Sequence, residues 1–115
     1  MTIGELINKN VYTCINIGEE LDRELEKPFC CDLLSIAMGR APKNAVWITV
    51  MGNVNTLAVA SLADVACIIL AEGANLDEGA IKKAKEQNVT VFSSEEPIFD
   101  IALQVHEWIH DTASL

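Results

Sequence analysis

Two nearly continuous apolar runs, residues 46–50 and 65–70, are the clearest pattern along the chain. Such runs are typical of parallel strands that helices cover on both faces. Residues 55–63 lie between them and are rich in Ala and Leu, which predicts a crossover helix. Another short apolar run follows at residues 89–92. The sequence therefore predicts adjacent parallel strands at 46–50, 65–70 and about 89–93.

The amino-terminal part shows one short helical pattern and one alternating pattern. Thr2 is a suitable N-cap, and the apolar residues after it recur at helical spacing until about Asn10. Residues 11–17 alternate between apolar and polar, which predicts a strand. The acidic segment 19–27, which Pro28 closes, is expected to be an exposed connection.

The segment after this connection is expected to form another helix. Asp32 is a suitable N-cap for residues 33–38, and Gly39 fits the left-handed position after a last helical turn. Strands and helices then alternate along the chain with short connections. This order predicts an α/β fold, namely one compact three-layer sandwich with a mainly parallel central sheet, formed by residues 1–115 as a single domain.

Two capping boxes are expected in the carboxyl-terminal third. Asn75 with Glu78 is predicted to open one helix, and Ser93 with Glu96 to open the last one. In such a box the cap side chain accepts from a backbone N–H three residues later, and the acidic side chain at that position accepts from the backbone N–H of the cap. Both helices would follow predicted strands or loops directly, as a layered α/β fold requires.

Composition and charge exclude several classes of function. Half of the residues are apolar, and eight basic against 17 acidic residues give a net charge of −9 at pH 7. This charge repels phosphate backbones and anionic membrane surfaces, so we expect no nucleic-acid and no membrane binding. The first residues lack the basic and apolar regions of an export signal, and the apolar runs are too short to span a bilayer. We therefore expect a cytoplasmic protein.

The four cysteines show no spacing typical of a metal or redox site. Cys14 and Cys67 are predicted to be buried reduced thiols, and the adjacent Cys30 and Cys31 to be more exposed. Zinc sites need clustered ligand pairs, which the adjacent cysteines do not provide. We therefore predict no metal and no cofactor.

Four segments between about Cys31 and Phe92 have the order and spacing of a known family. The chain resembles the DRTGG domain family in residues 31–35, 46–50, 55–62 and 68–73. The resemblance implies a compact α/β domain that occurs alone or attached to CBS-domain pairs, regulated pyrophosphatases or phosphotransacetylases. In those proteins the domain is regulatory and helps to build dimers, and it is not the catalytic part.

The chain departs from this family at the motif that gives it its name. Asp22 and Arg23 keep an acidic–arginine pair, but Glu26, Lys27 and Pro28 stand where the family has glycines. The flexible turn that the glycines would provide is therefore lost, which affects any function of that loop.

The last predicted helix contains an H-E-x-x-H pattern, in which two histidines one turn apart can bind zinc. A metal-dependent hydrolase using His106, Glu107 and His110 is therefore one alternative. Such a site needs a third protein ligand, and only residues 111–115 follow. The phosphate-binding loop of kinases is missing as well. We therefore predict that the protein is not an enzyme and has no catalytic residues.

Glycine and polar residues follow each of the predicted parallel strands. Loops at the carboxyl ends of parallel strands meet at one edge, where ligands usually bind. Their backbone N–H groups and hydroxyls suit a small nucleotide- or phosphate-bearing metabolite. The same residues also serve as ordinary turn formers, which is the alternative interpretation. The predicted ligand-binding residues are Thr49, Gly52, Asn53, Asn55, Glu72, Gly73 and Ser93.

The last helix carries two apolar stripes, whereas one is enough to dock it on its own sheet. We therefore predict a homodimer, whose interface includes Phe99, Leu103, His106 and His110. The leading hypothesis is a non-enzymatic regulatory module that homodimerises, senses a small metabolite and acts through a client protein. A structural interaction module without a ligand is the second hypothesis.

Overall fold

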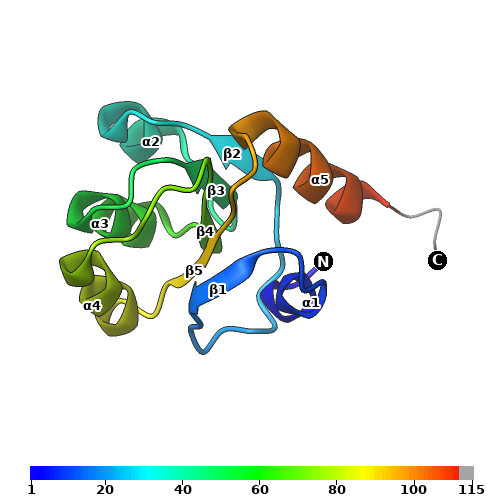
Figure 1. The fold of residues 1–115 in the computed structure, drawn as a ribbon, viewed down its shortest axis with the longest axis horizontal. Helices are drawn as coiled ribbons and strands as arrows, with labels where there is room; N and C mark the ends of the chain where they lie inside the picture. The colour runs from blue at the N-terminus through cyan, green and yellow to red at the C-terminus, as the bar shows by residue number, and fades with distance from the viewer. Residues whose placement is uncertain (112–115) are drawn as a thin grey trace.

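A five-stranded sheet lies between two layers of helices in the computed structural model, which describes residues 1–111 (Figure 1). The strands are β1 (Thr13–Asn16), β2 (Pro28–Cys30), β3 (Val46–Thr49), β4 (Cys67–Leu70) and β5 (Thr90–Ser93). The helices are α1 (Ile3–Asn8), α2 (Leu34–Arg40), α3 (Val54–Ala63), α4 (Glu78–Glu86) and α5 (Ile98–His110). The predicted three-layer α/β architecture is thereby confirmed.

The strand order is β1-β5-β4-β3-β2. Strands β2 to β5 are parallel, which confirms the three predicted parallel neighbours β3, β4 and β5. Strand β1 pairs antiparallel with β5, so the sheet is mixed, and the expectation of a mainly parallel sheet needs correction. A further strand, β2, was not predicted, and it begins at Pro28, directly after the connection expected over residues 19–27. Pro28 begins this edge strand, where proline is tolerated although it cannot donate to the ladder.

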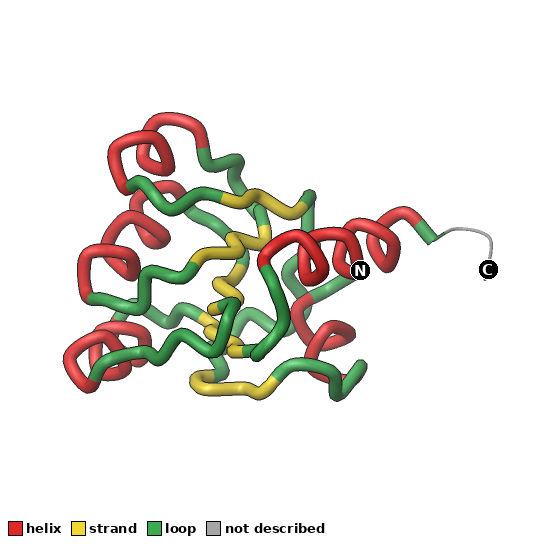
Figure 2. The backbone as a smooth tube through the Cα atoms, turned by 45° about the horizontal axis from the view of Figure 1, so that its top comes forward, coloured by secondary structure: helices red, strands yellow, loops and turns green. Residues whose placement is uncertain are grey.

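Each parallel crossover moves one strand along the sheet, so α2, α3 and α4 all cover one face. Helices α1 and α5 cover the other face (Figure 2). Because successive side chains of a strand point to opposite faces, β3, β4 and β5 contribute to both cores. Trp47, Ile68 and Val91 are in the core under α2 to α4, whereas Ile48 and Phe92 are in the core under α1 and α5.

The predicted amino-terminal helix has a complete capping box, with Thr2 as N-cap and Glu5 as its partner. The next cap was predicted wrongly. Leu33 is the N-cap position of α2, because the Asp32 carboxylate binds Thr49 and the Val50 N–H instead. Gly39 lies inside α2 and has no positive φ, so it does not end the helix.

The two later capping boxes were also predicted wrongly. Asp77 caps α4 by accepting from the Ala80 N–H at 2.8 Å, two residues after the expected cap Asn75. Helix α5 starts at N-cap Pro97 without a side-chain cap, because Ser93 is the last residue of β5. Both loops contain more than one residue whose side chain could cap a helix. Contacts of the loop with the rest of the fold decide which of these residues becomes the N-cap.

Within residues 1–111, every helix is too short or too polar to cross a lipid bilayer.

Candidate functional site

The predicted ligand site lies at the carboxyl edge of the sheet, where β3 turns into the loop before α3. Thr49 is buried, and its Oγ1 donates to the Asp32 carboxylate at 2.6 Å. The same carboxylate oxygen accepts from the Val50 N–H at 2.9 Å, and Thr49 Oγ1 accepts from the Met51 N–H at 3.2 Å. Asp32 lies just after β2, and its two hydrogen bonds hold the end of β3 in place.

Gly52 is packed against the loop that leads to α4. A Cβ at this position would lie 2.0 Å from the backbone oxygen of Asn75, and the Gly52 carbonyl accepts from the Asp77 N–H at 3.1 Å. Next to it, the Asn53 side chain accepts from the Thr56 N–H at 3.1 Å and caps α3. Gly52 is thus required for the close approach of two loops.

The loop after β4 turns through two residues with positive φ, Glu72 and Gly73. Their N–H groups donate to the carbonyls of Glu96 and Ser94 at 2.9 and 3.0 Å. The Glu95 carboxylate covers Gly73, because a Cβ there would lie 2.5 Å from its oxygen. Both N–H groups are therefore used in hydrogen bonds within the chain, and they attach this turn to the loop after β5.

A hollow of about 100 Å³ remains at this edge between the loops after β4 and β5 and the start of β1. Of the predicted residues, Gly73 and Ser93 line it. Thr49, Gly52, Asn53 and Glu72 are outside its lining, and Asn55 lines a groove between α2 and α3 instead. The lining residues are Thr13, Gly73, Ala74, Asn75, Ser93, Ser94 and Glu95.

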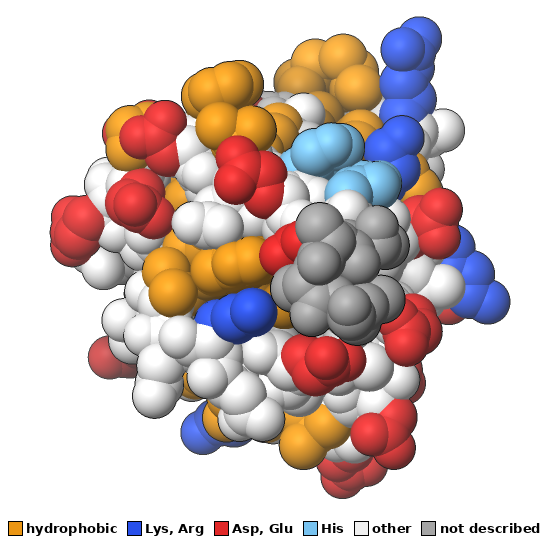
Figure 3. Space-filling model, turned by 90° about the vertical axis from the view of Figure 1, so that its right-hand side faces the viewer, with side chains coloured by type: hydrophobic (Ala, Val, Ile, Leu, Met, Phe, Trp, Pro, Cys, Tyr) orange, Lys and Arg blue, Asp and Glu red, His pale blue; other side chains and the backbone are white. Residues whose placement is uncertain are grey.

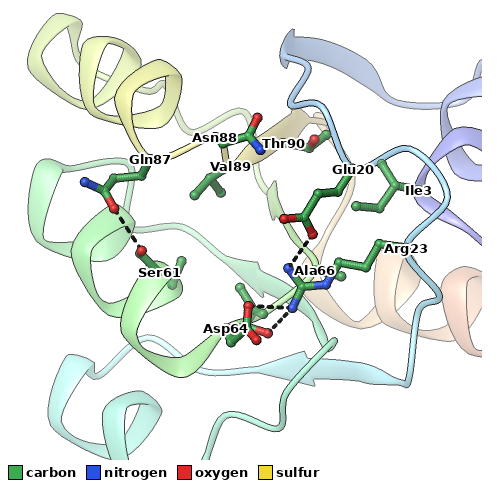
Figure 4. Close-up of a pocket in the computed structure, with 12 residues that line it drawn as sticks. Ile3, Glu20, Arg23, Ser61, Asp64, Ala66, Gln87, Asn88, Val89 and Thr90 are labelled. Carbon is green, nitrogen blue, oxygen red and sulfur yellow. Dashed lines mark hydrogen bonds and ion pairs between the residues drawn. The ribbon is translucent and has the colours of Figure 1, made fainter.

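The opposite, amino edge of the sheet has a smaller enclosed cavity of about 70 Å³ (Figure 4). It lies between the carboxyl ends of α3 and α4 and the starts of β4 and β5. Ser61 of α3 donates to the Gln87 side chain across its rim at 2.9 Å. Helix carboxyl ends carry partial negative charge, and the Glu20 and Asp64 carboxylates outnumber the one guanidinium in the lining, that of Arg23, so this cavity disfavours anions.

Arg23 closes this amino-edge cavity, as its side chain points from the β1–β2 connection toward α3 in Figure 4. Its Nε donates to Asn44 Oδ1 at 2.7 Å, and its two terminal nitrogens reach Glu20 at 3.3 Å and the Asp64 carboxylate at 2.8 Å. It also donates to the Asp64 carbonyl. The side chain is only 17% exposed. From the sequence, Arg23 was recognised only as part of the acidic–arginine pair, and its contacts with Asn44 and Asp64 were not predicted.

The predicted dimer face lies on α5, whose buried residues Ile101 and Val105 face the core. Phe99 and Leu103 point away from the core and are 70% and 44% exposed. His106 and His110 are exposed too, and Figure 3 shows the two imidazoles next to each other. All four predicted interface residues are therefore accessible in the single chain.

The two histidines contact each other and the helix backbone. Their ring centroids are 4.2 Å apart, and His110 Nδ1 is 2.9 Å from the His106 carbonyl oxygen. Clusters of three or more potential metal ligands do not occur in the described part of the chain. The residues after Asp111, where a third ligand was considered, lie outside the described residues.

The thiols differ in exposure. Cys67 is fully buried at the start of β4, and burial raises its pKa to about 12, although the Arg23 guanidinium acts in the opposite direction. Cys14 was predicted to be buried but is exposed on the edge strand β1. Cys30 is exposed as expected. A thiolate nucleophile is therefore disfavoured at Cys67.

Comparisons with known proteins place the fold. No protein-family model matches the sequence, and no curated protein matches it significantly. A solved structure does match, with a TM-score of 0.71 and 17% sequence identity, over 90% of this chain and 45% of the other. It contains the CBS and DRTGG domains of the regulatory region of Clostridium perfringens pyrophosphatase, complexed with the activator diadenosine tetraphosphate.

This likeness establishes the class of fold. The chain has a DRTGG-like α/β fold, as the resemblance in sequence implied. It spans less than half the length of the matching structure.

Proposed function

We propose that this protein is a non-enzymatic regulatory module that homodimerises through α5. The observation that carries the proposal is the second apolar face of α5, where Phe99 is 70% exposed while Ile101 and Val105 are fully buried. A helix that only covers its own sheet needs one apolar stripe. The likeness of the fold to a regulatory region supports the same class of function.

Sedimentation velocity at tens of micromolar protein tests the dimer. We expect a dimer for the wild type and a monomer for Phe99→Ser. Leu62→Ser is the matched control, because Leu62 is 75% exposed on α3, on the other face of the sheet. A monomeric wild type, or an unchanged dimer in Phe99→Ser, would contradict the proposal.

We place the sensed ligand at the carboxyl edge of the sheet, around Gly73 and Ser93. The hollow there offers hydroxyls, the Asn75 amide and the Glu95 carboxylate. Because the Gly73 N–H is already used, these groups favour the ribose or amine part of a metabolite over its phosphate. Thr49, Gly52, Asn53, Asn55 and Glu72 form or border the loops that shape this edge.

A thermal-shift screen of nucleotides, phosphorylated metabolites and divalent metals tests this site, because a ligand of the native state raises the melting temperature. Asn75→Leu is expected to abolish the shift produced by an active compound, since leucine keeps the shape of the side chain but loses the hydrogen-bonding groups of the amide. Gln87→Leu makes the same change at the amino edge and should leave the shift intact. The reverse pattern would place binding at the amino-edge cavity and contradict the proposal.

The same α5 face also supports a structural interaction module without a ligand. The regulatory module and the structural module both predict the dimer. They differ only in whether a compound in the thermal-shift screen raises the melting temperature. A wild type that dimerises but is stabilised by none of the compounds favours the structural module. Only the regulatory module is proposed to act through a client protein.

A further inference from the structure

The outer side of α2 and α3 carries an apolar groove on the face opposite α5. It is an open hollow of about 590 Å³ with few polar groups. Met38 and Leu62 stand on its two sides and are 58% and 75% exposed. The lining residues are Leu34, Ser35, Met38, Gly39, Asn55, Ala58, Val59 and Leu62.

The outward side of α3 differs from that of its neighbour in the same layer. Helix α3 contains no charged residue, and Val54 and Leu62 are exposed on it in addition to the residues that face the sheet. Helix α4 covers the same sheet but carries Glu78, Lys82 and Lys85 among its exposed residues. The outer side of a surface helix is normally polar, whereas on α3 Val54 and Leu62 are exposed beside Asn55 and Ser61. The outer side of α3 is therefore suited to packing against another protein segment, whereas the charged outer side of α4 is suited to solvent.

Within residues 33–63, which form α2, β3 and α3, the charged residues are Arg40 and Lys43, and both are positive. The sequence contains no Asp or Glu between Asp32 and Asp64, although the whole chain has a net charge of −9. Arg40 ends α2 at one end of the groove and makes no ion pair with the described residues. Gly39 adds open space there, because a Cβ at this position would meet nothing within 4 Å. An acidic partner would therefore find a free cation beside an apolar surface.

A second copy of the chain fits this groove poorly. Groove-to-groove pairing would bring Arg40 of two copies together, and the carboxylate at the end of α3, that of Asp64, is already paired with Arg23 and Lys43. Docking α5 of one copy into the groove of another would join opposite faces, and such a contact does not close with two copies.

We propose that the α2/α3 groove binds an acidic amphipathic helix of a partner protein. The partner helix would place apolar residues at positions i, i+3 or i+4 and i+7 between Met38 and Leu62, and a carboxylate against Arg40. A groove along the ten residues of α3 accommodates about 15 Å of helix, or roughly three turns. This inference rests on the proposed function, because it gives a surface to the client protein of the regulatory module.

Two synthetic peptides test this surface on the full chain. Each has about 14 residues and leucines at helical spacing, and they differ only in having Glu or Lys at the flanking positions. Fluorescence anisotropy measures affinity, and amide chemical shifts in NMR map the contact. We expect the acidic peptide to bind at least about tenfold more tightly than the basic one. The largest shifts are expected in α2 and α3.

Variants separate the apolar contribution from the charge contribution. Leu62→Asp should weaken binding of the acidic peptide about tenfold or more, and Arg40→Glu should reverse the preference between the two peptides. Both side chains are exposed, so the fold is retained, which circular dichroism can verify. Equal binding of the two peptides, no effect of Leu62→Asp, or shifts confined to α5 would overturn the inference.

The same variants distinguish this inference from the proposed dimer. Phe99→Ser should make the chain monomeric without changing peptide affinity. If the wild type is monomeric and the acidic peptide still binds, the dimer is wrong and the groove stands. If Leu62→Ser dissociates a dimer that Phe99→Ser leaves intact, the groove is an interface between copies and the inference fails.

Discussion

The two edges of the parallel strands are stabilised by different kinds of contact. At the amino edge one side chain, that of Arg23, joins three segments through Asn44, Glu20 and Asp64. At the carboxyl edge the loops contact each other mainly through their backbones, as Gly52 and Asn75 do. The amino edge should therefore respond to loss of a side-chain head group, and the carboxyl edge to addition of a single methyl group.

The largest effect is expected for Gly52→Ala at the carboxyl edge. The added Cβ would lie 2.0 Å from the Asn75 carbonyl oxygen, so one backbone segment must move. We expect a loss of about 3 kcal/mol or more in the free energy of unfolding, measured by urea denaturation.

Gly39→Ala is the matched control for this change. Gly39 lies within α2, and its Cβ would meet nothing within 4 Å, so alanine should stabilise the protein by about 0.5–1 kcal/mol. If both variants changed stability by similar amounts, close backbone packing would not distinguish the carboxyl edge.

The next largest effect is expected for Arg23→Met at the amino edge. Methionine keeps much of the apolar stem but loses every hydrogen bond to Asn44 and Asp64. Because Glu20 and Asp64 are more than half exposed, water can solvate them in the variant. We therefore expect a loss of about 2 kcal/mol in the same assay.

Arg40→Met controls for the loss of a positive charge. Arg40 forms no ion pair among residues 1–111, so this variant should change stability by less than about 0.5 kcal/mol. Equal losses for the two arginine variants would show that net charge, and not the contacts of Arg23, decides the effect.

A smaller effect is expected for Asp32→Ala, which tests the one side-chain contact that organises the carboxyl edge. Its carboxylate accepts from Thr49 Oγ1 and the Val50 N–H. Removing it leaves the buried Thr49 hydroxyl without its acceptor, for a loss of about 1–2 kcal/mol. Asp32→Asn keeps an acceptor oxygen and should lose less. A larger loss for Asn than for Ala would contradict this account.

The central strands could be predicted from sequence because a strand buried on both faces leaves a local signature. The runs that became β3 and β4 contain almost no polar residue. The direction of β1 could not be predicted, because its partner β5 lies more than 70 residues away and β1 has an irregular register. Asp32 was taken for a helix cap because its true partner, Thr49, is distant in sequence.

The candidate site was predictable in outline for the same reason. Parallel strands deliver their loops to one edge, so Gly73 and Ser93 do share a hollow. Which backbone N–H groups remain available depends on contacts between loops, which a single sequence does not encode locally. The Arg23 contacts were missed because two of its partners, Asn44 and Asp64, are 21 and 41 residues away.

The smallest effect is expected from the only tyrosine, Tyr12, which lies just before β1 near the carboxyl edge. Its hydroxyl is buried without a hydrogen-bond partner among the described residues. Burial, with a smaller contribution from the Glu96 carboxylate, raises the pKa of Tyr12 from 10.0 to about 12. The tyrosinate absorbance of the folded protein should therefore have its midpoint near pH 12, and that of the urea-unfolded chain near pH 10.

Because the pKa of Tyr12 is higher in the folded state, its contribution to stability is complete below pH 10 and is lost as the pH rises toward 12. Cys67 contributes in the same direction from about pH 9, since burial raises its pKa to about 12. Tyr12→Phe should remove the tyrosine part of this alkaline loss and leave that of Cys67. A folded-state absorbance midpoint near pH 10 would show that water reaches the Tyr12 hydroxyl, and that the carboxyl edge is more open than its backbone contacts imply.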